Sequence, residues 1–260
     1  MIDTHCHILP VDDGAKDMEE SIKMARVAQK DGIKKIINTT HFNPEFEYPK
    51  GKILLDKISE LNDILKKENI DIEVFPGNEL YYNEALIKDI EKNNIEFYTL
   101  NNSKYILLEF SPSRFPKKLE EVVYEFSIKG YKVVLAHVER YKELQEEPEI
   151  IDKAIQEGAY IQVNVSSVLK KGPKTVNSLC EKLLKEGKVH IVASDAHGFD
   201  KRRPMLKDGY EYIKNEYGEE NAKILFIKNP SNILEDEELL DMEEVKKKSF
   251  LARLFSKRSN

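Results

Sequence analysis

The chain has 260 residues, of which 40% are hydrophobic and 34% are charged, a composition that fits a folded globular protein and excludes a disordered one. No apolar run approaches the roughly 18 residues that a membrane span needs, and the N-terminus lacks the pattern of a signal peptide, so we expect a cytoplasmic protein. The net charge of −6 argues against nucleic acid as a partner, because duplex binding depends on neutralising phosphates.

Short runs rich in β-branched residues predict seven strands along the chain. The segments between them are amphipathic, as in helices, and the first such segment has Asp17 as a candidate N-cap and Gly32 as a stop signal. Strands that alternate with helices form a parallel sheet, so we expect one α/β domain of barrel type. The predicted strands are residues 1–4, 34–39, 72–75, 105–108, 132–136, 160–163 and 189–193.

Histidine and acidic side chains directly follow these predicted strands. In a parallel αβ barrel the carboxyl ends of the strands meet at one mouth, so residues far apart in sequence converge there. His5 and His7 can face the same ion, because side chains two positions apart in a strand share a face. The candidates are His5, His7, Asp12 or Asp13, His41, Glu79, Glu109, His137, Asn164, Asp195 and His197.

Two further polar residues have simpler interpretations. Asn164 ends a strand, a position where asparagine is most often a helix cap. His190 begins the seventh strand instead of following it, and we expect it to have a structural or surface role.

The chemical nature of the candidates indicates a class of metal. Imidazoles and carboxylates without a thiolate suit borderline-hard divalent ions such as Mn, Fe or Zn. One ion usually takes three or four protein ligands, so this number of candidates predicts two or three ions. Three divalent ions would outweigh the charge of Asp13, Glu79, Glu109 and Asp195 and leave a cationic pocket that attracts phosphate.

The cysteines exclude one way of handling phosphate. Cys6 and Cys180 suit a reducing compartment and are too few for a disulfide framework. A cysteine-dependent phosphatase loop has an arginine six positions after its cysteine, but Asp12 and Glu186 occupy those positions. Any phosphate chemistry here therefore does not use a thiolate nucleophile.

Seven motifs occur in order along the chain: H-x-H at residues 5–7, D-D-G at 12–14, T-H at 40–41, G-N-E-L-Y at 77–81, L-E-F at 108–110, A-H-V-E-R-Y at 136–141 and S-D-A-H at 194–197. In this order they resemble the polymerase and histidinol phosphatase (PHP) superfamily, and within it the bacterial manganese-dependent protein-tyrosine phosphatases of the CpsB/CapC type. This resemblance implies a distorted (β/α)7 TIM-like barrel over residues 1–235, with its metal site at the carboxyl ends of the strands. Residues 236–260 would then form a charged tail.

The resemblance also implies roles for single residues. Phosphate contacts map onto Arg140 and onto one of Arg202 and Arg203, with Asp195 and His197 in the same catalytic centre. The implied reaction is hydrolysis of phosphotyrosine in proteins by a metal-bound hydroxide. The implied partner is the Tyr-rich tail of a bacterial tyrosine kinase that regulates capsular or extracellular polysaccharide synthesis. The implied ligands, with Mn as the expected metal, are His5, His7, Asp13, His41, Glu79, Glu109, His137, Asp195 and His197.

Three alternatives remain open at this point. One is a PHP phosphatase for a small metabolite such as histidinol phosphate, and another is a metal-stabilised scaffold that binds a kinase tail without cleaving it. A related amidohydrolase is disfavoured, because that group has a bridging lysine where this chain has Glu109.

Two segments have an open role. Residues 42–49 are aromatic and, with Phe110 and Phe115, would either line the site for a phenyl ring or pack under a loop. Residues 246–260 contain six Lys or Arg and no Asp or Glu. Within them a basic amphipathic helix would either contact an anionic membrane or a partner, or pack back on the domain. The sequence does not indicate an oligomeric state.

Overall fold

The computed structural model describes residues 1–46, 51–93 and 96–243, and within them nine strands pair in parallel. They form two sheets, with the strand orders β1-β2-β4 and β3-β5-β6-β7-β8-β9. The strands are β1 (Ile2–Cys6), β2 (Lys35–Asn38), β3 (Thr40–Phe42), β4 (Glu73–Phe75), β5 (Asn78–Tyr81), β6 (Tyr105–Glu109), β7 (Lys132–Leu135), β8 (Tyr160–Asn164) and β9 (Ile191–Ala193).

Each predicted run contains a strand, and two of the runs are each followed by a further short strand, so the described residues hold nine strands where the sequence predicted seven. The second run stops at Asn38 and the chain continues as β3, while the third is followed by β5. At the first break, Thr39 donates its N–H to Cys6 O and accepts the Cys6 N–H on its hydroxyl, both at 3.0 Å. At the second, a Cβ on Gly77 would lie 2.8 Å from Ile37, so only glycine fits there. His41 and Glu79 consequently lie inside β3 and β5, not after a strand.

The first and last strands also meet, so the sheet curls on itself. The His7 N–H donates to Ala196 O and the Asp195 N–H donates to His5 O, both at 2.8 Å. An isolated parallel bridge joins Cys6 to Ala196. These contacts bring the residues after β1 beside the residues after β9.

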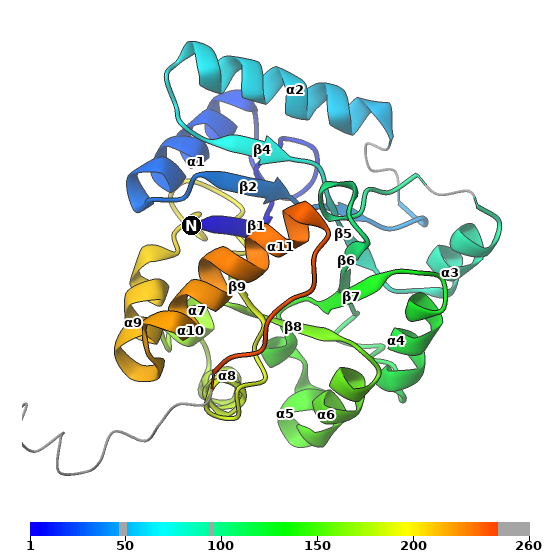
Figure 1. The fold of residues 1–260 in the computed structure, drawn as a ribbon. Coiled ribbons are helices and arrows are strands. Elements are labelled where there is room, and N and C mark those ends of the chain that lie inside the picture. The colour runs from blue at the N-terminus through cyan, green and yellow to red at the C-terminus, as the bar shows by residue number, and fades with distance from the viewer. Residues whose placement is uncertain (47–50, 94–95, 244–260) are drawn as a thin grey trace, which may run out of the picture.

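Helices surround the curled sheet on its outer side (Figure 1). The first is capped as predicted, because Asp17 accepts the Glu20 N–H at 2.8 Å and Gly32 adopts φ 89°. No helix of the described part of the chain is long and apolar enough to cross a membrane. The helices are α1 (Met18–Asp31), α2 (Lys52–Lys67), α3 (Glu84–Glu91), α4 (Leu119–Ser127), α5 (Lys142–Glu146), α6 (Glu149–Gln156), α7 (Val165–Val168), α8 (Lys174–Lys185), α9 (Lys207–Tyr217), α10 (Glu219–Lys223) and α11 (Asn229–Glu235), with a π-helical turn at Ile224–Lys228 and 3-10 turns at Leu100–Asn102 and Val138–Arg140.

The alternation of side chains along each strand divides the core into two layers. In β6, Ile106 and Leu108 belong to the large layer that packs against the helices, whereas Tyr105 and Leu107 belong to a smaller cluster inside the curl. Helix α11, which crosses the strands in Figure 1, contributes Ile233 to this inner cluster. The same alternation places Glu109 on the inner side, at the carboxyl end of β6.

Residues 236–243 follow α11 and remain hydrogen bonded to the domain. The Tyr105 hydroxyl donates to Glu237 O at 2.5 Å, and the Leu240 N–H donates to the Asn229 side chain at 2.7 Å. The predicted basic segment at 246–258 lies outside the described residues.

Candidate metal centre

The buried carboxylate of Glu79 lies at the centre of the predicted site and contacts four imidazoles. Its Oε2 lies 3.3 Å from His5 Nε2, 3.2 Å from His7 Nε2 and 3.3 Å from His41 Nδ1. Its Oε1 lies 2.9 Å from His137 Nε2. Strands β1, β3, β5 and β7 thus deliver side chains to one point.

Three further carboxylates extend this cluster toward the surface. Asp13 Oδ1 lies 3.4 Å from His41 Nε2 and 3.3 Å from His197 Nε2, and its side chain is 62% exposed. Glu109 Oε1 lies 2.9 Å from His41 Nδ1. Asp195 Oδ1 lies 3.5 Å from His5 Nε2 and 3.5 Å from His197 Nδ1. The structure therefore brings all nine implied ligands into one connected cluster.

The donor set has the chemistry of a divalent-cation site. His5 Nε2 and His7 Nε2 lie 3.3 Å apart and both approach the same Glu79 oxygen, an arrangement of converging lone pairs that a cation satisfies. The buried Nδ1 of His137 has no hydrogen-bond partner among the described residues. Three groups each place their ligand atoms within 4.8 Å of one another: His7, Asp13, His41 and His197; His5, His7 and Asp195; and His41, Glu79 and Glu109.

Without metal, protons balance the charges of this cluster. Burial alone would lower the pKa of His7, but its contacts with Asp12 and Glu79 outweigh burial and raise the pKa to about 9. Burial would also lower the pKa of His41, but its contacts with Asp13 and Glu109 outweigh burial and raise the pKa to about 12. Hydrogen bonds from His197 and His41 lower the pKa of Asp13. Metal ions entering this site would therefore displace protons from imidazoles.

The two neighbouring aspartates have different positions. The Asp12 side chain is fully buried, accepts the Gly14 and His41 N–H groups at 3.0 and 2.9 Å, and contacts His7 Nδ1 at 2.9 Å. Asp13 instead faces the cluster. A Cβ on Gly14 would lie 2.1 Å from His7 O, so glycine allows this turn to close against the strand.

Two arginines contact the same carboxylate through different oxygens. Arg140 Nη1 lies 3.1 Å from Asp195 Oδ2, and Arg202 Nη2 lies 2.7 Å from Asp195 Oδ1. Their side chains are 50% and 48% exposed, so both guanidinium groups remain accessible at the mouth. Arg203 is exposed, and it is Arg202, not Arg203, that the structure places against Asp195.

Sequence reasoning missed Gln162 and misjudged Asn164. The Asn164 side chain makes no cap hydrogen bond and instead donates to Asp195 Oδ2 at 2.8 Å, so the cap interpretation was wrong. Gln162 is buried on the same side of β8 and contacts His5, His137 and Asn164. The available signal was a polar side chain in an otherwise apolar run, two positions before Asn164. His190 is buried and structural, because its Nδ1 accepts the Ile161 N–H at 3.0 Å.

The predicted aromatic lining is only partly at the surface. Phe42 is buried with its ring 5.6 Å from that of Phe97, and Phe110 is buried with its ring 5.8 Å from that of Tyr141. Phe115 is half-buried, and Phe46 is exposed. Phe42 and Phe110 thus pack in the core instead of lining the mouth, and part of residues 42–49 lies outside the described ranges.

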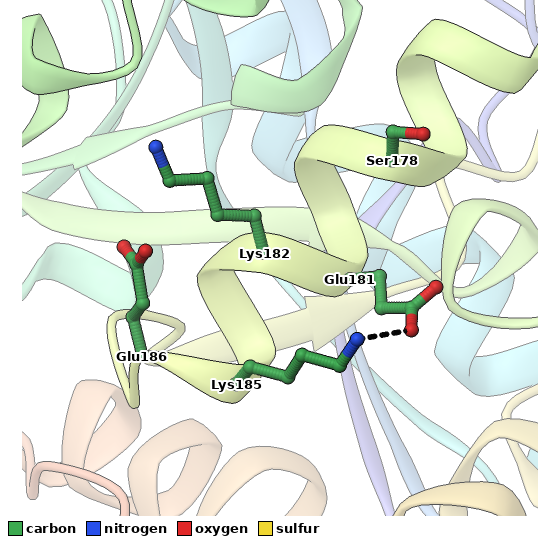
Figure 2. A pocket seen from close by; sticks show the side chains of 5 residues that line it. All are labelled: Ser178, Glu181, Lys182, Lys185 and Glu186. Atoms are coloured by element: carbon green, nitrogen blue, oxygen red, sulfur yellow. Dashed lines mark ion pairs between the residues drawn. The ribbon is translucent and has the colours of Figure 1, made fainter.

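Figure 2 shows a different hollow, on helix α8, that contains none of the cluster residues. Its lining comes from one helix and the residue after it, and Glu181 pairs with Lys185 at 2.5 Å and with Lys170 at 2.9 Å. Glu186 pairs with Lys188 at 2.7 Å, so both acidic groups of this hollow already have a lysine partner, and the histidine cluster remains the stronger candidate for a site.

Comparisons with known proteins agree with the geometry. A family model described as capsular polysaccharide synthesis, CpsB/CapC, matches residues 1–235. The tyrosine-protein phosphatase YwqE of Bacillus subtilis is 35% identical over 221 residues, which cover 85% of this chain and 86% of that protein. The tyrosine-protein phosphatase CpsB of Streptococcus agalactiae serotype III is 34% identical over 243 residues, covering 91% and 99%.

Solved structures show the same fold. One reported for YwqE from Bacillus subtilis and CpsB from Streptococcus pneumoniae, described as unique metal-dependent tyrosine phosphatases, has a TM-score of 0.86 at 33% identity and covers 94% of this chain and 98% of that chain. A histidinol phosphate phosphatase from Lactococcus lactis has a TM-score of 0.53 at 11% identity and covers 86% and 94%. The second likeness shows the fold alone.

Proposed function

This chain belongs to the CpsB/CapC family of capsular polysaccharide synthesis, and on that premise we propose that it is a metal-dependent protein-tyrosine phosphatase. The relatives that share about a third of its residues over most of its length are named tyrosine-protein phosphatases. The observation that carries the proposal is the convergence of nine ligand side chains and two arginines at one mouth. The histidinol phosphate alternative rests on the fold alone and is disfavoured.

We propose that two or three divalent ions, with Mn first and Fe or Zn as alternatives, occupy the cluster. The three ligand groups described above, which share His7 and His41, support more than one ion. When bound, such ions lower the pKa of coordinated water and neutralise phosphate oxygens.

Side chains at the mouth would bind the phosphate and stabilise its charge. Arg140 and Arg202 can each bind two nonbridging phosphate oxygens through their planar guanidinium groups and stabilise the charge that develops on them. Both now contact the oxygens of Asp195, so a phosphate held by the pair would lie beside that ligand. Asp195 contacts both arginines, and the His197 N–H donates to Arg202 O at 2.9 Å, so the catalytic role we assign to these two proposed metal ligands is to hold the arginines beside the ions.

We further propose that the ring of strands is a distorted (β/α)7 barrel in which two strands are broken. The contacts between β1 and the residues after β9, and the continuation of β2 into β3 and β4 into β5, support this reading. The family description supports a substrate in capsule or exopolysaccharide synthesis, and we propose the Tyr-rich tail of a tyrosine kinase. A cytoplasmic location is consistent with two free, buried cysteines.

The test compares two substrates before and after removal of metal. Purified full-length protein is analysed for bound elements and assayed with a phosphotyrosyl peptide and with histidinol phosphate. We expect peptide turnover that chelation abolishes and Mn²⁺ restores. Asp195→Ala should abolish it, whereas Ser178→Ala in the α8 hollow serves as the matched control. Folded, metal-loaded protein that does not hydrolyse the peptide would refute the proposal.

A further inference from the structure

The two histidines of the H-x-H pair are supported by different chemical groups. The Nδ1 of His7 contacts the carboxylate of Asp12 at 2.9 Å, whereas the Nδ1 of His5 contacts the amide oxygen of Gln162 at 3.2 Å. In metal sites, the group on the far nitrogen of an imidazole fixes which nitrogen carries the proton and therefore which one can bind the ion. The far nitrogen of His5 is thus held by a neutral amide that is not one of the nine candidate ligands.

The orientation of the Gln162 amide follows from its other partners. The backbone N–H of His137 can only donate, and it lies 2.8 Å from Gln162 Oε1, so the amide oxygen is on that side. The Gln162 nitrogen then donates to Asn164 Oδ1 at 2.9 Å. The Asn164 nitrogen in turn donates to Asp195 Oδ2 at 2.8 Å, where a carboxylate can only accept. The two amide groups can therefore satisfy these hydrogen bonds in only one orientation.

This direction determines the state of His5. Because Gln162 Oε1 only accepts, His5 Nδ1 carries a proton, which leaves Nε2, facing Glu79 and Asp195, as the nitrogen that can bind an ion. We propose that Gln162 is a positioning residue that fixes the His5 tautomer and, through Asn164, the orientation of Asp195. It thereby connects ligands delivered by β1, β7 and the turn after β9. The inference rests on the proposed metal-dependent function.

Burial makes an amide better suited to this position than a carboxylate. Gln162 is fully buried, and its partners His5 and Asn164 contact Glu79 and Asp195, so a further negative charge there would be costly. A carboxylate would also have no donor for Asn164. The backbone of Asn164 is held separately, since its N–H donates to the buried Glu139 carboxylate at 2.9 Å. The side-chain relay can therefore be altered while the end of β8 stays in place.

The test measures Mn²⁺ binding to chelator-stripped, full-length protein by calorimetry. Loss of such a supporting group typically weakens metal binding about 10- to 100-fold, and we expect a loss of that size at one site in Gln162→Leu. The matched control is Asn62→Leu, which removes two hydrogen bonds to Val74 outside the cluster. Unfolding midpoints of both variants separate this effect from general destabilisation.

A second variant and a spectroscopic signature keep the test decisive. Gln162→Glu keeps the acceptor for His5 but loses the donor to Asn164, so the His5 ring should keep its proton on Nδ1. In Zn²⁺-loaded protein labelled with ¹⁵N-histidine, this proton is observed directly, and Gln162→Leu should lose its preference for Nδ1. If the wild-type protein binds Mn²⁺ and Gln162→Leu binds it with the same affinity, this inference is overturned and the proposed function is not. Wild-type protein that binds no Mn²⁺ overturns the proposed function as well.

Discussion

Three residues at the mouth hold a backbone conformation that side chains disfavour. His137, Asp195 and Arg202 have φ of 35°, 51° and 47°, all in the left-handed region. Such residues store free energy of roughly 1 to 3 kcal/mol each where the surroundings enforce them, commonly at functional sites. His137 and Asp195 come shortly after β7 and β9, and the side chains of all three take part in contacts of the cluster, since His137 contacts the carboxylate of Glu79 and Arg202 contacts that of Asp195.

The strain at Asp195 predicts an ordering of two inactive variants. Asp195→Ala and Asp195→Gly both lose the carboxylate, but only glycine adopts φ 51° without steric cost. We expect the glycine variant to be the more stable by about 1 kcal/mol in metal-free denaturant unfolding. Equal or reversed stabilities would show that the left-handed turn is not strained in solution.

The two neighbouring arginines give a second prediction at this scale. Arg202 contacts Asp195 at 2.7 Å, while Arg203 is exposed. Arg202→Ala should lower kcat on a phosphotyrosyl peptide about 100- to 1000-fold, the usual cost of removing one donor to a developing oxyanion. Arg203→Ala should change kcat by less than about threefold. A larger effect at Arg203 would reverse the assignment that the sequence left open between them.

At the scale of elements, the end of the sheet near α11 depends on one neutral histidine. His190 accepts the Ile161 N–H on Nδ1, and its own carbonyl accepts from Asn229 at 2.8 Å, so it joins β8, β9 and α11. Burial lowers the pKa of His190 below 6.5, although Asp241 opposes this shift. The ring of Tyr160 packs against the imidazole, with 5.2 Å between the ring centroids.

This histidine predicts an acid sensitivity. As the pH falls below about 6.5, the unfolded chain takes up a proton at His190 before the folded one does, so the free energy of unfolding decreases. His190→Asn keeps an acceptor for Ile161 but does not titrate, so it should lose less stability between pH 7 and pH 5. Denaturant unfolding of both metal-free proteins measures this difference, and parallel pH profiles would contradict the prediction.

The pattern of elements and most of the candidate site were accessible from the sequence, and the misses have local causes. The β-branched runs and the cap at Asp17 identify the βα units, but the break after Asn38 depends on hydrogen bonds between Thr39 and Cys6 that no local pattern encodes. The candidate ligands are visible because histidine and acidic side chains recur near the ends of the predicted strands. Gln162 was missed because the one signal it gives, a polar side chain within an apolar strand, does not indicate which residues it contacts until the fold brings His5 and His137 beside it.

At the scale of the whole molecule, the cluster couples metal binding to protons and to stability. Mn²⁺ at about 100 times its dissociation constant should raise the free energy of unfolding by about 2.7 kcal/mol. His7, with a pKa of about 9, and His41, with a pKa of about 12, hold protons near neutral pH that the metal must displace. Metal affinity should therefore increase with pH.

The stability of the metal-free protein should instead decrease as the pH rises above neutral. The raised pKa of His7 contributes stability that is fully present below about 6.5 and is lost as the pH rises toward about 9. Thermal unfolding at pH 6.5 and pH 8.5 measures this. The difference in unfolding midpoint between protein with Mn²⁺ and protein with chelator should be larger at pH 8.5. A difference that stays constant would mean that the imidazoles of the empty site are already neutral.

The buried thiol between the two leading histidines has a practical consequence for inhibitors. Cys6 is fully buried, and burial raises its pKa well above 9.0, so it carries no reactive thiolate at neutral pH. Alkylating reagents that silence cysteine-dependent phosphatases act on such a thiolate. Iodoacetamide should therefore leave the folded protein unmodified and fully active, so a loss of turnover in its presence would reveal an accessible cysteine. Cys180 is buried too, and burial raises the pKa of its thiol, so compounds directed at this chain should mimic phosphate or bind the proposed ions instead of reacting with a thiolate.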